Sequence, residues 1–272
     1  MKTLPVAVQV YSVRDDAQRD FSGTMRKLKE IGYDAVELGG MYGHAPEKLR
    51  DMLAEAGLKP LSAHVPFSDF NDGVAKTVND YKTIGCEYVA IPYLPEEMRP
   101  GNCDFNAVID QIKTIGSACW DAGITLLYHN HDFEFEKMDD GKYVLDYIYE
   151  NVPADLLQVQ PDTCWIHVAG VNPAEYIKKY TGRVPVVHLK DYLGTKTKNM
   201  YELMGDEAKA DAPAEKFQFA SVGAGKQNIP DVLKASVESG AKWVVVEQDM
   251  SLKQPMLDEV RASRDYLKSL GW

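Results

Sequence analysis

The residues of this chain that could do chemistry are polar side chains that stand where short apolar segments end. Asp162, His188 and Glu247 each end one of three successive β-branched segments, and His129 ends the segment before them. If these segments are neighbouring parallel strands, their carboxyl ends meet at one rim and the four side chains converge. Uncompensated buried carboxylates are costly, and a divalent cation neutralises them while using their oxygens as ligands.

Two imidazoles and two carboxylates suit Mn²⁺, Co²⁺, Fe²⁺ or Zn²⁺ better than Ca²⁺. We expect one divalent ion, with Mn²⁺ as the first choice and Mg²⁺ as a further option. Such an ion can accept two sugar oxygens, polarise a carbonyl and lower the pKa of the adjacent C–H or O–H group. A nearby base then removes the proton. Its return to the neighbouring carbon isomerises the sugar, its return to the opposite face epimerises it, and loss of a β-leaving group makes a lyase.

The elements that must position these side chains are indicated by β-branched segments that alternate with helical patterns. Apolar residues at helical spacing occur, for example, at Phe21, Met25 and Leu28. Glycines such as Gly32 and Gly123 follow helical stretches, where a left-handed C-cap is needed. This alternation predicts right-handed βαβ units and a parallel sheet. The expected strands are residues 6–10, 35–38, 60–64, 88–91, 124–130, 157–160, 184–189 and 243–248.

Eight such strands in 272 residues predict an α/β fold of the (β/α)8 TIM barrel type, as a single domain over residues 1–272. An open doubly wound sheet is the alternative, although no G-x-G-x-x-G motif follows the first strand. One polar stretch, residues 194–219, follows the seventh strand. An insertion there lies on the active face of a barrel, where it is either a lid or a helical excursion without a role in the site.

Composition excludes several classes of function. The formal net charge is −11 and no basic stripe is visible, which argues against nucleic acid and anionic membranes as partners. No segment is long and apolar enough to span a bilayer, and the first apolar run is read as a strand and not as a leader. The four cysteines form no C-x-x-C pair, which favours reduced thiols. We therefore expect a cytoplasmic protein.

With these residues in place, the chain resembles the xylose isomerase-like barrel superfamily of sugar phosphate isomerases and epimerases along its full length. The resemblance rests on residues 8–15, 32–38, 128–131, 161–165, 187–191 and Glu247. It implies a small sugar or polyol as substrate and isomerase or epimerase activity. It also implies a metal ion bound by His129, Asp162, His188 and Glu247. Inosose dehydratases and tagatose epimerases belong to the same group of relatives.

One departure from the family pattern concerns His129, because family epimerases usually carry Glu at this place. In those enzymes two glutamates flank the substrate as an acid/base pair, and here only Glu247 remains. Imidazole can ligate in place of a carboxylate, so metal binding survives the change. A second base would come from Lys190, His131 or Glu37. A metal-dependent lyase or dehydratase acting on a keto-sugar or inosose, including 3-keto-glycoside cleavage, is therefore the rival function.

Other strand-end residues are expected to contact the substrate or to orient ligands. Lys190 contacts a substrate oxygen or pairs with Asp191 or Asp162, while Asp191 orients His188 through its second ring nitrogen. Trp165 stacks on a sugar or simply packs. The expected catalytic residues are Glu247, Lys190 and His131. The expected substrate-binding residues are Gln9, Tyr11, Glu37, His64, Trp165 and Lys190.

Two further functions are compatible with a barrel of this kind. The DNA endonuclease branch of the same superfamily needs more histidines than the six present here, together with a basic face. A non-catalytic sugar-binding barrel is also compatible with the fold, because a fold does not guarantee chemistry. The resemblance is compatible with a homo-oligomer, since family members are often dimers or tetramers.

Overall fold

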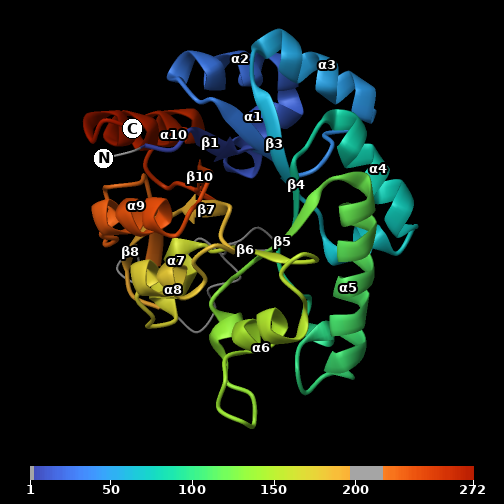
Figure 1. The fold of residues 1–272 in the computed structure, drawn as a ribbon. Helices are drawn as coiled ribbons and strands as arrows, with labels where there is room; N and C mark the ends of the chain where they lie inside the picture. The colour runs from blue at the N-terminus through green and yellow to red at the C-terminus, as the bar shows by residue number, and fades with distance from the viewer. Residues whose placement is uncertain (1–2, 197–216) are drawn as a thin grey trace.

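The computed structural model describes residues 3–196 and 217–272, which form a barrel of parallel strands surrounded by helices (Figure 1). Its eight-stranded sheet has the order β6-β5-β4-β3-β2-β1-β10-β7. The two end strands meet where Asp162 and His188 form a parallel bridge, with the N–H of His188 donating to the carbonyl of Pro161 at 2.9 Å. The predicted barrel is confirmed, and the open doubly wound alternative is wrong. The strands are β1 (Val6–Gln9), β2 (Ala35–Leu38), β3 (Lys59–His64), β4 (Tyr88–Ile91), β5 (Thr125–His129), β6 (Gln158–Gln160), β7 (Val186–Leu189) and β10 (Trp243–Val246).

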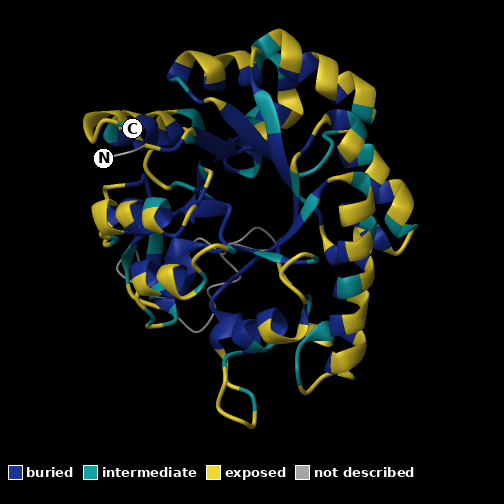
Figure 2. Cartoon of the chain, viewed as in Figure 1, coloured by how far each residue is buried: buried dark blue, intermediate teal, exposed yellow. Residues whose placement is uncertain are grey.

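Helices cover the outside of the barrel and turn their exposed faces to solvent (Figure 2). Helices α2 and α5 end at Gly32 and Gly123, whose φ angles of 104° and 75° are left-handed, as their places in the sequence predict. The helices are α1 (Arg14–Arg19), α2 (Phe21–Ile31), α3 (Pro46–Ala56), α4 (Val74–Ile84), α5 (Phe105–Ala122), α6 (Val144–Asn151), α7 (Thr163–Val168), α8 (Pro173–Lys179), α9 (Ile229–Glu238) and α10 (Met256–Ser269). No described helix is long and apolar enough to cross a membrane.

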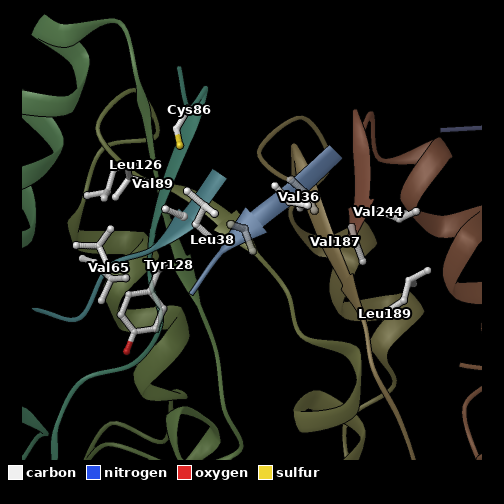
Figure 3. Packing of buried hydrophobic residues seen from close by; sticks show 14 of the residues in the cluster. Val36, Leu38, Val65, Cys86, Val89, Leu126, Tyr128, Val187, Leu189 and Val244 are labelled. Atoms are coloured by element: carbon white, nitrogen blue, oxygen red, sulfur yellow. The ribbon is translucent and has the colours of Figure 1, made fainter. Parts of the chain in front are cut away.

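The apolar core has two layers because both faces of the parallel strands are buried. The larger layer lies between strands and helices, and Figure 3 shows Val36, Leu38, Val187 and Val244 among its members. The smaller layer fills the barrel interior and consists of Ala7, Ala35, Leu61, Ala90, Leu127, Val186 and Val245. This inner layer fills the barrel below its carboxyl-terminal rim, so the polar residues at the strand ends pack against apolar side chains.

An antiparallel pair follows the seventh barrel strand, formed by β8 (Asp191–Gly194) and β9 (Phe217–Ala220). The insertion predicted over residues 194–219 therefore begins and ends in this pair. Residues 197–216 lie outside the described residues, and with them most of the segment read as a lid or a helical excursion. All four cysteines are unpaired thiols, three of them buried and Cys103 exposed.

Candidate metal centre and active site

Four candidate ligands from successive strand ends meet at the carboxyl-terminal rim of the barrel. His129 is the last residue of β5, Asp162 is the N-cap of α7 just after β6, His188 lies in β7, and Glu247 follows β10. One candidate ligand atom from each lies within 4.8 Å of the others, and all four residues are buried. The strand order explains this convergence, because β5 adjoins β6 and β7 adjoins β10.

The spacing of the donor atoms suits a single divalent ion. Nδ1 of His188 lies 3.1 Å from Oε2 of Glu247, and Nε2 of His129 lies 3.7 Å from Oδ2 of Asp162. Ligands held about 2.0–2.2 Å from one ion lie roughly 3–4.4 Å apart. Oδ1 of Asp162 accepts the N–H of Trp165, whereas its buried Oδ2 has no hydrogen-bond partner in the described part of the chain. A metal ion would satisfy this oxygen, so the residues present fit the ion that the family implies.

The two carboxylates of the cluster differ in how firmly they hold a proton. Burial raises the pKa of Asp162 to about 7, although Lys190 acts in the opposite direction. Burial also acts to raise the pKa of Glu247, but Lys190 and His188 together outweigh it and hold that pKa well below its usual range. Glu247 is therefore ionised at neutral pH, while Asp162 is close to its titration point.

The two imidazoles of the cluster also differ in pKa. Burial lowers the pKa of His129 well below its usual range, and the neighbouring His188 adds to this effect. Burial acts in the same direction on His188, but Glu37 and Glu247 outweigh it and raise its pKa to about 10. His129 is thus a neutral donor already, whereas His188 must give up a proton before it can bind a cation.

Lys190 is a buried cation held among three carboxylates. Its Nζ lies 2.8 Å from Oδ2 of Asp249, 3.3 Å from Oε2 of Glu247 and 3.8 Å from Oδ2 of Asp162. Burial acts to lower the pKa of Lys190, but Asp249 and Glu247 outweigh it and raise that pKa. Of the two predicted pairings, that with Asp162 is present and that with Asp191 is not. Asp249 has no predicted role, although it follows Glu247 by two residues, a spacing that keeps strand side chains on one face.

Asp191 does not orient His188, and that prediction is wrong. Its Oδ2 accepts the N–H groups of Gly223 and Gly225, both at 3.0 Å, and its Oδ1 accepts that of Gln227 at 3.0 Å. A Cβ atom on Gly225 would lie 2.1 Å from Oδ1 of Asp191, so this loop needs glycine there. Asp191 therefore anchors the loop after β9, and the ring nitrogens of His188 face other carboxylates.

A cavity of about 390 Å³ opens beside the donor cluster. This volume lies within the range of pockets that hold small molecules, about 300–1,000 Å³. The predicted site residues that line it are Tyr11, His64, His129, His131, Lys190 and Glu247. Its outer wall is more apolar and includes Pro66, Pro92, Tyr93, Arg99 and Phe133.

Three predicted substrate-binding residues do not line this cavity. Gln9 and Glu37 are fully buried, and Nε2 of Gln9 donates to Oε1 of Glu37 at 2.8 Å. Trp165 is also fully buried, with its ring centroid 5.3 Å from that of His131 and 6.1 Å from that of Phe217. The structure therefore favours packing over sugar stacking for Trp165. The carboxylate of Glu37 is surrounded by a network of protein groups, which disfavours the expected bond to substrate hydroxyls.

His131 is held against the cavity wall by the loop that follows β5. Its backbone N–H donates to Oε2 of Glu134 at 2.7 Å, and its ring stacks on Phe133 with centroids 5.4 Å apart. Burial, followed by the charge of Lys190, lowers the pKa of His131 well below its usual range, so the ring is neutral. Its buried Nδ1 has no hydrogen-bond partner among residues 3–196 and 217–272. His131 also lines the cavity, so its ring lies beside the space that a bound molecule would occupy.

A parallel barrel with polar donors gathered at the carboxyl ends of its strands defines a TIM-barrel protein whose site lies at that rim. The chain belongs to the xylose isomerase-like TIM barrel family, whose model matches residues 25–270. The family predicted from the strand-end motifs is thereby confirmed.

Individual relatives are distant. An inosose dehydratase of Geobacillus kaustophilus is 24% identical over 189 residues, and the match covers 61% of this chain and 60% of that protein. A sugar phosphate isomerase/epimerase from Parabacteroides distasonis superposes with a TM-score of 0.78 at 21% identity, covering 99% of this chain and 95% of that one. The IOLI protein, solved with a zinc atom, superposes with a TM-score of 0.70 at 14% identity, covering 98% of each chain. At these identities the solved structures establish the fold alone.

Proposed function

We propose that this protein is a divalent-metal-dependent isomerase or epimerase of a small sugar or sugar phosphate, acting by removal of a proton next to a carbonyl. The observation that carries the proposal is the cluster of four buried donors beside a cavity, in which Oδ2 of Asp162 lacks a hydrogen-bond partner among the described residues. A buried carboxylate oxygen that accepts no hydrogen bond from these residues and lies 3.8 Å from Nζ of Lys190 is better explained by a ligand than by packing.

The ion would be held by His129, Asp162, His188 and Glu247, with Mn²⁺ as the first expectation. The zinc atom in the structurally similar IOLI protein supports a divalent ion without fixing which one. When bound, such an ion supplies Lewis acidity, polarising a substrate carbonyl and stabilising negative charge on its oxygen. Two imidazoles and two carboxylates balance its charge, and the remaining positions of such an ion suit the vicinal oxygens of a sugar.

The residues of the chain would then handle the proton. Glu247 is ionised and lines the cavity, so it is placed to accept a proton from the substrate carbon. Lys190, 3.3 Å from Glu247, stabilises negative charge that develops on the substrate. His131 offers a neutral ring whose Nδ1 lacks a partner within the described ranges, and it can exchange a proton with a substrate hydroxyl. Tyr11 and His64 line the same cavity and would contact further hydroxyls.

A lyase is the second candidate, and a specific observation favours it. The strand-five position that would supply a second carboxylate for two-base epimerisation holds His129, whose imidazole is instead directed into the donor cluster. A single base is sufficient for elimination next to a carbonyl. The dehydratase name of the Geobacillus kaustophilus relative points the same way, and the substrate would then be a keto-sugar, an inosose or a 3-keto-glycoside.

The two activities are separated by their products. Purified protein is first analysed for bound metals, and then incubated in D₂O with candidate keto-sugars while NMR spectra are recorded. Isomerase or epimerase activity gives a deuterated sugar isomer with every carbon–oxygen bond retained. Lyase activity gives loss of water or of an aglycone and an unsaturated ketone that absorbs in the ultraviolet. Tight sugar binding by protein without metal, and without turnover, would refute both candidates and favour a sugar-binding barrel.

A further inference from the structure

We propose that Glu37 is a positioning residue that fixes the tautomers of the site histidines, so that the ion is bound through Nε2 of His129 and Nδ1 of His188. The inference rests on the proposed metal site, and it goes further by selecting which nitrogen of each ring can bind. It also explains why a fully buried carboxylate lies beneath a site that already contains several others.

The carboxylate of Glu37 is enclosed by polar groups of the chain itself. Oε1 and Oε2 lie within hydrogen-bonding distance of side chains from four other barrel strands, β1, β3, β6 and β7. These neighbours are Nε2 of Gln9 (2.8 Å), Oγ of Ser62 (2.5 Å), Nε2 of Gln160 (2.7 Å), Nε2 of His64 (2.9 Å) and Nε2 of His188 (2.7 Å). The hydroxyl and the two amides are donors, so each oxygen is occupied from within the protein. Glu37 therefore acts on the site through its neighbours and not on a substrate.

His188 is fixed directly. Its Nε2 lies 2.7 Å from Oε1 of Glu37, outside the angles of a hydrogen bond but close enough that the negative charge of Glu37 favours a proton on this nitrogen. Once the ring is neutral, the lone pair is on Nδ1. Before an ion binds, Nδ1 forms a hydrogen bond with Oε2 of Glu247 at 3.1 Å, and this is the proton that an ion bound to both groups would displace. A buried carboxylate behind a ligating histidine is a common way to fix its tautomer.

His129 and His64 are fixed through Gln160. Because Nε2 of Gln160 donates to Oε2 of Glu37, the amide oxygen must point the other way. That oxygen lies 3.2 Å from Nδ1 of His129 and 3.0 Å from Nε2 of His64. An amide oxygen only accepts, so both of these nitrogens carry protons. The lone pair of His129 is then on Nε2, which lies 3.7 Å from the unpaired Oδ2 of Asp162.

This assignment decides between two groupings of donors. His64, His129 and His188 also have ring nitrogens within 4.8 Å of one another, so spacing alone allows a three-histidine site. The nitrogens that face Glu37 and Gln160 carry the protons, and an ion placed among them would have to displace those protons. On the carboxylate side only Nδ1 of His188 has to lose a proton, Nε2 of His129 offers a lone pair, and Oδ2 of Asp162 accepts no hydrogen bond from the described residues. The network under the site therefore directs the ion to the four-residue cluster.

The first test measures the tautomers themselves. Full-length protein with ¹⁵N-labelled histidine is loaded with Zn²⁺, and two-bond ¹H–¹⁵N spectra separate protonated, metal-bound and free ring nitrogens. We expect Nε2 of His188 and Nδ1 of His129 to carry protons, with Nδ1 of His188 and Nε2 of His129 bound to zinc. Zinc on Nε2 of His188 would overturn the inference. This test uses the wild-type protein, so its result does not depend on whether any variant folds.

The second test measures affinity for Mn²⁺ and Zn²⁺ by competition with a chromogenic chelator. Glu37→Gln should weaken binding about 10–100-fold, the usual cost of losing the partner behind a ligating histidine. Glu259→Gln is the matched control, since Glu259 is a buried carboxylate that bonds to serines outside the site and its loss should leave affinity unchanged. Equal affinity in Glu37→Gln and wild type would refute the role of Glu37 alone. Failure of the wild type to bind any divalent ion would instead refute the proposed function, and this inference with it.

Discussion

Two polar layers meet at the rim of the barrel, a lower one around Glu37 and an upper one around Asp162, and these two carboxylates differ in how completely they are hydrogen-bonded. The lower layer surrounds Glu37, whose carboxylate is occupied by donors from other strands. The upper layer contains Asp162 and His131, each with a buried atom that has no hydrogen-bond partner in the portions of the chain described. A buried polar group whose hydrogen bonds are all made within the protein fixes the positions of its neighbours. A buried polar atom without a hydrogen bond is a candidate for binding a ligand. Hydrogen bonding thus distinguishes Glu37, which we propose to be a positioning residue, from Asp162, which we propose to be a metal ligand, although both are buried carboxylates.

The largest expected effect is the loss of metal affinity when a candidate ligand of the upper layer is removed. His188→Ala and Glu247→Ala should each lower affinity for Mn²⁺ on the order of 100-fold or more, because four ligands share about 10–16 kcal/mol in strong metal sites. Elemental analysis after gel filtration measures the metal content, and circular dichroism checks the fold. His167→Ala is the control, since His167 bonds to Tyr192 away from the donor cluster. Full metal occupancy in both site variants would refute the cluster.

The next expected effect is a difference in the free energy of unfolding between variants of the two layers. Ser62→Ala removes a donor to the Glu37 carboxylate, and should lower the free energy of unfolding by about 1.5–3 kcal/mol, the range for hydrogen bonds to charged groups. Asp162→Asn keeps an oxygen to accept the N–H of Trp165 and replaces only Oδ2, which accepts no hydrogen bond from the described part of the chain and lies 3.8 Å from Nζ of Lys190. It should leave the metal-free protein as stable as wild type or more so. Urea unfolding in the presence of a chelator measures both, and equal destabilisation by the two changes would contradict the contrast.

The sequence predicts the architecture well because its signals repeat. Alternating strands and helices and glycine caps locate all eight barrel strands, and strand ends such as His188 and Glu247 predict where polar groups gather. Which strand-end side chains line the cavity and which are buried within the protein is harder to predict. Glu37 comes from a strand end like the other site residues, but its partners in register are Gln9 and Ser62, and its buried carboxylate is not part of the cavity lining. The anchoring role of Asp191 depends on a loop from a distant part of the chain, which no local pattern reveals.

The third expected effect is a pH dependence of metal affinity, set by His188 and Asp162, and the lower layer contributes to it because Glu37 helps raise the pKa of His188. The pKa of His188 is raised to about 10, so below that pH the ring holds a proton that a metal ion must displace. Apparent affinity should therefore rise about tenfold for each pH unit, since one proton leaves for each ion bound.

Below about pH 7 the slope should steepen, because burial raises the pKa of Asp162 to about 7 and its carboxyl then also holds a proton. Chelator competition between pH 6 and pH 9 measures this slope, referenced to the free chelator at each pH. An affinity independent of pH over this range would show that neither group is a ligand.

The smallest expected effect on the metal comes from His129→Glu, which places a carboxylate where family epimerases carry one. Affinity for Mn²⁺ should stay within about tenfold of wild type, since either side chain can bind the ion. The contact between His129 and Gln160 would be lost, yet Glu37 would still hold His188 from below. If the wild type is a lyase because it lacks a second carboxylate, the variant should begin to exchange deuterium into recovered sugar. Complete loss of metal would instead mean that the imidazole is specifically required, and that the lower layer selects a nitrogen which no carboxylate can replace.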